Sequence, residues 1–160
     1  MKLYQLLILS LLILILACSN SIDSGEKLNF EDLNIEYSKS GGWINHTSLK
    51  IDSAGFVKAV IHFHATWETL DSNTTTLTST EKKNLCDMFE SFKELKNYYE
   101  PNHYYTDQDY HVIILKTEAG NDTTSVYDPA HCILPNDLNR ILNFMDQKID
   151  DLLFDHTSAK

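Results

Sequence analysis

The residues best suited to chemistry are two histidines, His62 and His64, which are separated by one residue. On an extended strand, residues i and i+2 point to the same side about 7 Å apart, so both imidazoles would lie on one face. A zinc site would need a third ligand from a neighbouring strand, for which His111 is a candidate, with Glu68 or Asp109 as a carboxylate. Nothing in the sequence shows that these groups converge. The alternative is two half-exposed histidines on a solvated sheet face.

Cysteine offers a second kind of chemistry. Cys132 follows His131 directly, but adjacent side chains usually point apart and make a poor nucleophile and base. Cys86 and Cys132 form a disulfide or remain two buried thiols, and spacing alone does not choose between these states. The chain has no Gly-x-Ser-x-Gly elbow and no glycine-rich phosphate-binding loop. We therefore predict a protein that is not an enzyme and has no cofactor.

Strands must position these residues, and alternation of apolar and polar side chains predicts where they lie. The segments 33–38, 49–51 and 57–68 alternate in this way, and the third of them carries both His62 and His64. Its other parity is apolar and predicts a face turned to the core: Val57, Ala59, Ile61, Phe63, Ala65 and Trp67.

Two helices and a hairpin complete the prediction. Residues 78–81 match a capping box, and an apolar stripe with helical spacing follows from Leu85 to Tyr99. The segments 110–115 and 123–127 predict a hairpin. A second helix is predicted to start at Pro135, with this buried stripe: Leu138, Ile141, Leu142, Met145, Ile149 and Leu152.

The predicted fold class is α+β, with the element order βββαββα. We expect an antiparallel sheet of four to five strands with both helices packed on one face, and a threonine-rich loop over 71–76. The opposite face, carrying His62 and His64, would be open to water or to a partner.

The N-terminus predicts export and lipid anchoring. Lys2 is followed by an apolar run over 6–17, and the small residue Ala17 precedes Cys18. The end of this run resembles a bacterial lipobox, so cleavage before Cys18 would leave that cysteine lipidated. A transmembrane helix is the weaker alternative, because a span needs about 20 apolar residues. Secretion without lipid is the other alternative.

We therefore divide the chain into a lipoprotein signal peptide (1–17), a polar tether (18–29) and a single α+β domain (30–160). Lys and Arg number 13 and Asp and Glu number 23, so the net charge is −10, and removal of Lys2 with the signal peptide brings it to −11. Nucleic acids and anionic lipids need clustered basic residues, so this charge argues against them as partners. The predicted membrane contact is the lipid on Cys18, in the bacterial cell envelope on the periplasmic or outer side.

A turn with an aromatic residue is the candidate binding feature. Gly41 and Gly42 are followed by Trp43, and an exposed tryptophan is a common interface anchor. The alternative is that Trp43 folds back over the edge of the sheet.

Several segments together resemble the emfourin-like inhibitors, compact bacterial proteins whose founding member inhibits a thermolysin-like protease. The resemblance spans about residues 33 to 153 and is carried by turn and core positions: residues 35–42, residues 49–52, Leu77 with Glu81 and Leu85, Asp109 with Tyr110, and Leu134 with Pro135 and Leu138. It implies an envelope-anchored inhibitor that places a loop in a metalloprotease cleft, and residues 41–43 are our candidates for that contact. The family's simplest members lack a lipid anchor, and no inhibitory residue is carried over.

Together these patterns predict a lipid-anchored binding module, with protease inhibition as its specific form. The alternative is a structural or ligand-binding envelope lipoprotein, with metal binding through His62 and His64 as one version.

Overall fold

The structure is a computed structural model that describes residues 28–41, 44–63, 65–103 and 108–154. The predicted signal peptide and several candidate residues lie outside this range: Cys18, Gly42, Trp43 and His64.

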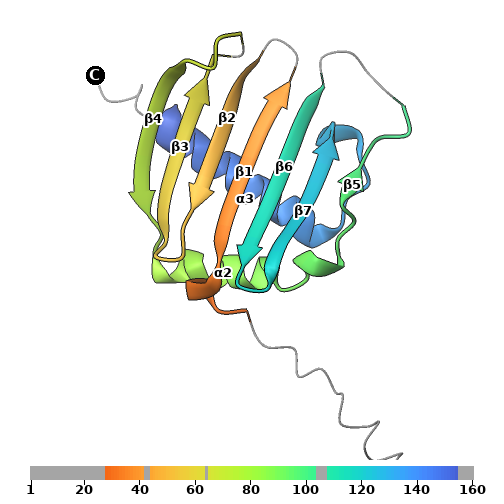
Figure 1. The fold of residues 1–160 in the computed structure, drawn as a ribbon. Helices are drawn as coiled ribbons and strands as arrows, with labels where there is room; N and C mark the ends of the chain where they lie inside the picture. Colours follow the sequence, from red (N-terminus) through yellow and green to blue (C-terminus); the bar gives the residue numbers. More distant parts are fainter. Residues whose placement is uncertain (1–27, 42–43, 64, 104–107, 155–160) are drawn as a thin grey trace, which may run out of the picture.

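The protein is an α+β domain built on a seven-stranded sheet with the order β4-β3-β2-β1-β6-β7-β5 (Figure 1). Neighbouring strands are antiparallel except β5 and β7, which run parallel. The fold class is therefore confirmed, and the prediction of four to five strands, all antiparallel, is wrong. The strands are β1 (Asn34–Gly41), β2 (Ile44–Ile51), β3 (Phe56–His62), β4 (Thr69–Thr76), β5 (Tyr98–Tyr99), β6 (Asp109–Thr117) and β7 (Gly120–Tyr127).

The edge strand β4 was predicted as a loop because its side chains are polar. Its threonines are β-branched and favour an extended backbone, while its position at the edge leaves nearly all of its side chains in contact with water. Polarity therefore marks an edge here and not the absence of a strand.

The strand β3 is shorter than predicted because the chain turns back after His62. The amide of Phe63 donates to the carbonyl of Glu68 at 2.8 Å, and the amide of Trp67 donates to the carbonyl of Phe63 at 2.8 Å. Phe63 and residues 65–68 thus belong to the connection to β4. Phe63 and Trp67, which the alternation assigned to the core, are exposed.

The helices are α2 (Ser79–Phe89) and α3 (Asn136–Leu153), with short 3-10 turns η1 (Phe30–Asp32), η2 (Phe92–Glu94) and η3 (Pro129–His131). Both halves of the predicted capping box are present, since Thr78 and Glu81 bond to each other's backbone amides. The first helix is shorter than its apolar stripe suggested, and Tyr99 belongs to β5.

Of the two α-helices in the described residues, α3 lies across a face of the sheet and α2 lies at the lower end of the strands in Figure 1. There α2 contacts α3 and η1. The expectation that both helices pack side by side on one face is therefore corrected. The core between α3 and the sheet includes Ile35, Leu49, Ile113, Ile141 and Met145.

Within the described residues, the opposite face of the sheet carries no helix, as predicted (Figure 1). We call it the open face. The C-terminal ends of β1 and β3 lie at one end of the sheet, and η1, where the described chain begins, lies at the other end.

Candidate functional site

The predicted site residue His62 lies on the open face, at the end of β3 farthest from η1. Its cross-strand partner is His46 of β2, and the two rings are 6.2 Å apart. The indole of Trp67 lies 4.9 Å from the ring of His46 and 6.2 Å from that of His62. We call these three residues the aromatic cluster.

Trp67 is held at the surface by its backbone. It has a φ of 57°, a left-handed conformation that is unusual for a bulky residue. Its side chain is 64% exposed, and the neighbouring side chains of Phe63 and Leu70 are exposed as well. Backbone strain of this kind tends to persist where the surrounding structure enforces it, often at functional sites. An exposed apolar group held in this way is a candidate contact for a partner.

A pocket of about 330 Å³ lies beside the aromatic cluster on the same face. His62 forms one side of it, and the imidazole Nδ1 of His62 lies 3.4 Å from the hydroxyl of Thr69. The pocket is partly open to solvent, which suits binding of a surface ligand better than a reaction that excludes water.

The predicted zinc ligands do not come together among the described residues. His111 lies on the helix-covered face of the sheet and is 2% exposed, whereas His62 lies on the open face. Asp109 lies beside His111, and Glu68 closes the β3–β4 connection. Within the described ranges, no three side chains of His, Cys, Asp or Glu are grouped as a metal site. The expectation that His111 completes a site with His62 is therefore wrong.

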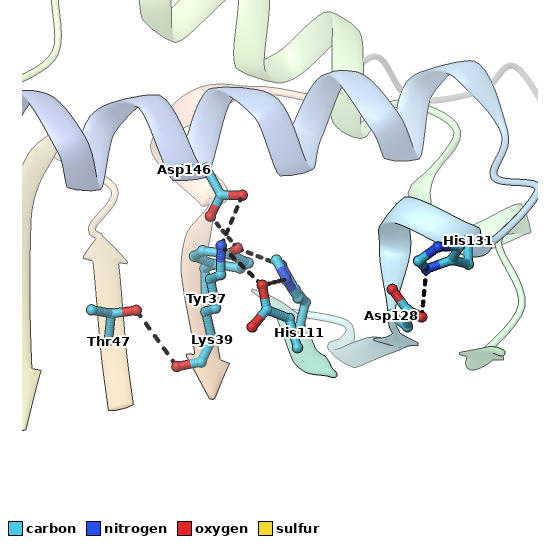
Figure 2. A network of polar contacts seen from close by, with 8 residues as sticks. Tyr37, Lys39, Thr47, His111, Asp128, His131 and Asp146 are labelled. Carbon is cyan, nitrogen blue, oxygen red and sulfur yellow. Dashed lines mark hydrogen bonds and ion pairs between the residues drawn. The ribbon is translucent and has the colours of Figure 1, made fainter. Parts of the chain in front are cut away.

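A second polar cluster lies between the sheet and α3 (Figure 2). The hydroxyl of Tyr37 donates to Asp146 Oδ1 at 2.6 Å. The phenolic oxygen of Tyr37 also lies 2.6 Å from Nδ1 of His111. Lys39 Nζ lies 3.4 Å from Asp109 and 3.7 Å from Asp146. These five residues, which we call the Tyr37 network, join β1 and β6 to the helix.

The hydrogen bonds fix the tautomer of His111. Because the proton of Tyr37 goes to Asp146, the imidazole must donate from Nδ1 to the phenolic oxygen. Nε2 is then the unprotonated nitrogen, and it is buried with no hydrogen-bond partner, 4.0 Å from Asp109. Burial lowers the pKa of His111, against the opposing effect of Asp146, so the ring is neutral at pH 7.

The hydroxyl of Tyr37 is not suited to acid–base catalysis at neutral pH. Burial, together with the charge of Asp146, raises the pKa of its hydroxyl far above the ordinary tyrosine value. We interpret the network as a structural link between α3 and the sheet.

The predicted binding residue Gly41 has a structural reason to be glycine. It ends β1 opposite Asp109 of β6, and a Cβ placed there would lie 2.9 Å from the Cα of Asp109. The two backbones could not approach so closely with a larger residue. Gly42 and Trp43, the other members of the predicted turn site, lie outside the described residues, so that part of the prediction stays a prediction.

The two candidate cysteines are not joined. Both Cys86 and Cys132 are thiols, and the sulfur of Cys132 donates to the carbonyl of Tyr127 at 3.1 Å. The imidazole Nδ1 of His131 lies 2.7 Å from Asp128 Oδ2 (Figure 2). Burial raises the pKa of Cys132, and the negative charges of Asp128 and Glu100 raise this pKa further. A thiol with a raised pKa is a weak nucleophile at neutral pH.

Comparison with known proteins gives no assignment: no family model matches the chain, and a search of curated proteins finds no match. No helix among the described residues has the length and apolar character needed to cross a bilayer.

Sequence reasoning missed several residues of these clusters, among them His46, Trp67 and Asp146. His46 was overlooked because residues 45–48 are polar and the strand was predicted only from residue 49. Trp67 was assigned to the core by parity. Asp146 follows the buried Met145 on α3, and its pairing with Tyr37 needs the register of the helix on the sheet, which no local pattern contains.

Proposed function

We propose that this chain is a lipoprotein of the bacterial envelope, anchored through Cys18, and that its domain is a binding module whose contact surface is the open face at the aromatic cluster. The observation that carries the proposal is the exposed indole of Trp67, fixed by a left-handed backbone and packed against two histidines.

The position of the cluster supports the same conclusion. It lies at the end of the sheet opposite η1, so a tether attached before η1 would leave the cluster turned away from the anchor. A partner approaching from outside the membrane would meet this end first.

The more specific form of the proposal is inhibition of a thermolysin-like metalloprotease. Its support is the resemblance to the emfourin-like inhibitors, and the candidate contact is the turn that contains Gly41, Gly42 and Trp43. This turn connects β1 to β2, the strand that carries His46 of the aromatic cluster.

The experiment is affinity capture from envelope and secreted fractions with the full chain purified in detergent. Trp67→Ala is compared with Phe154→Ala, which truncates another exposed aromatic residue, at the end of α3. We expect partners captured by the wild type to be lost with Trp67→Ala and kept with Phe154→Ala. Capture that is equal for all three proteins would contradict the proposed surface.

Two further measurements separate the components of the proposal. Mass spectrometry of the mature protein should find a lipid-modified Cys18 at its N-terminus, and an unmodified N-terminus would exclude the anchor. A thermolysin-like protease inhibited by the wild type and equally by Trp43→Ala would exclude the turn as the inhibitory contact.

A further inference from the structure

Basic and hydroxyl side chains follow each other along the open face of β2 and β3. Cross-strand pairing sets Lys50 opposite Lys58 and His46 opposite His62. The two pairs are four positions apart along each strand, a distance of about 13 Å. The cationic pair and the histidine pair thus stand at the two ends of one stretch of sheet.

The lysine pair is unfavourable in the protein by itself, because like charges directly opposite each other destabilise a sheet. Lys50 has a counter-ion, Glu36, at 3.1 Å, but Lys116 also binds the same carboxylate oxygen at 3.0 Å. No ion pair joins Lys58 to an acidic group in the described ranges. Glu36, Lys50, Lys58 and Lys116 together carry a charge of +2, on a chain whose net charge is −10.

The pocket of about 330 Å³ lies on this stretch, between the lysine pair and the histidine pair. Besides Lys50, Lys58 and His62, its lining consists of Ser48, Val60, Thr69 and Ser72. Hydroxyl groups both donate and accept hydrogen bonds, so they suit a ligand that carries hydroxyl groups of its own. The volume falls in the range of sites for small ligands.

An aromatic surface adjoins the pocket. The ring of His62 lines it, and the indole of Trp67 lies 6.2 Å from that ring with its side chain mostly exposed. The site therefore combines fixed positive charge, hydroxyl groups and an aromatic surface within the length of one or two sugar rings.

An extended peptide is a poorer fit, because side chains of β4 already occupy two amides of the adjacent sheet edge. The amide of Asp52 donates to the carbonyl of Phe56, so the backbone N–H and C=O groups of Phe56, and of every second residue after it on β3, point toward β2. The backbone groups of the residues in between point toward β4, where they meet those of Asp71 and Asn73. The amides of Ser72 and Thr74 therefore point outward from the edge of the sheet.

Two of the outward amides, those of Ser72 and Thr74, already have acceptors. The Ser72 amide donates to Asp71 Oδ1 at 2.7 Å, and the Thr74 amide donates to Asn73 Oδ1 at 2.8 Å. A peptide strand would have to displace these side chains to pair with β4.

From these observations we infer that the pocket beside Lys58 binds a carboxylated sugar. Its carboxylate would lie between Lys50 and Lys58, its hydroxyl groups would bond to Ser48, Thr69 and Ser72, and its ring would extend toward Trp67. The same chemistry is presented by a free sugar acid and by one residue of an acidic polysaccharide. The inference rests on the proposed use of the open face for binding.

The test is isothermal titration calorimetry of the full chain in detergent with three probes: glucuronic acid, an oligosaccharide of hexuronic acid residues, and glucose as the uncharged control. Lys58→Glu reverses the unpaired charge, and Lys83→Glu makes the same change at an exposed position of α2. A hydrogen bond to a charged group contributes about 1.5–3 kcal/mol, so Lys58→Glu should weaken acid binding by about 10- to 100-fold.

We expect at least one acidic probe to bind, with wild-type affinity kept in Lys83→Glu. Binding of glucuronic acid alone identifies a site for a free sugar acid, and tighter binding of the oligosaccharide identifies a polysaccharide. The inference is overturned if neither acid binds, if glucose binds as well as the acids, or if Lys58→Glu binds like the wild type. If the acids fail but Trp67-dependent capture succeeds, the ligand class is wrong and the proposed function stands.

Discussion

Removal of one oxygen atom tests the Tyr37 network most sharply. Tyr37→Phe keeps the buried ring and deletes the hydroxyl that bonds both Asp146 and His111 at 2.6 Å. The Nδ1 proton of His111 would then lose its acceptor inside the protein, where the side chain is 2% exposed. Asp146 would keep its contact with Lys39 at 3.7 Å.

The magnitude follows from these losses. A buried donor left without a partner costs about 1–3 kcal/mol, and a hydrogen bond to a carboxylate contributes more than a neutral one. The phenylalanine ring leaves the packing almost unchanged, so we expect Tyr37→Phe to lower the free energy of unfolding by about 2–3 kcal/mol.

Urea denaturation followed by circular dichroism measures this value, and Tyr110→Phe on the exposed side of β6 is the matched control. The midpoint should fall for Tyr37→Phe with an unchanged slope, since the surface exposed on unfolding is the same. The control should unfold like the wild type. If Tyr37→Phe is as stable as the control, the network does not hold α3 to the sheet.

Two further predictions concern pH and the edge of the sheet. Burial by itself would raise the pKa of Glu81, but hydrogen bonds from Lys148 and Thr78 outweigh it and lower the pKa to about 2, below the ordinary 4.5. The stabilisation by ionised Glu81 is therefore complete above about pH 4.5 and is lost as the pH falls toward 2. In urea titrations, Glu81→Gln should lower the free energy of unfolding by about 2 kcal/mol at pH 6 and by little at pH 2. A cost that is independent of pH would contradict this. Replacing Asp71 and Asn73 together by alanine should free the outward amides of Ser72 and Thr74 and promote self-association through β4, measured by sedimentation velocity. The control variant Thr76→Ala should stay monomeric. A double variant that also stays monomeric would show that these side chains do not protect the edge.

The fold class was predictable because the apolar patterns of the strands and helices are mutually consistent. The α3 stripe from Leu138 to Leu152 is buried as its spacing predicts, and the hairpin of β6 and β7 forms around Gly120. Leu33 and Ile35 face the core for the same reason. These features depend on local periodicity, which the sequence carries directly.

The number of strands was not predictable from periodicity. At β4, polar side chains on an edge strand give no alternation, and at β5 the apolar stripe continued past the end of the helix at Phe89. The turn after His62 reversed the faces expected for Trp67, because alternation holds only while the backbone stays extended.

The candidate site divides along the same line. The exposure of His62 on an open sheet face was predicted, since strand parity decides it. The placement of His111 depends on which strand parity faces α3, and the pairing of His46 with His62 depends on register across two strands. Both depend on several segments together, so the local pattern of one segment does not predict them.

The central claim is that the open face of β2 and β3 at Trp67 is the binding surface. The most direct test is nuclear magnetic resonance of isotope-labelled protein titrated with a partner recovered by capture. The account predicts chemical-shift changes at His46, His62 and the indole of Trp67, with the amides of α3 unchanged. Changes confined to α2 and α3, with the open face unaffected, would contradict it.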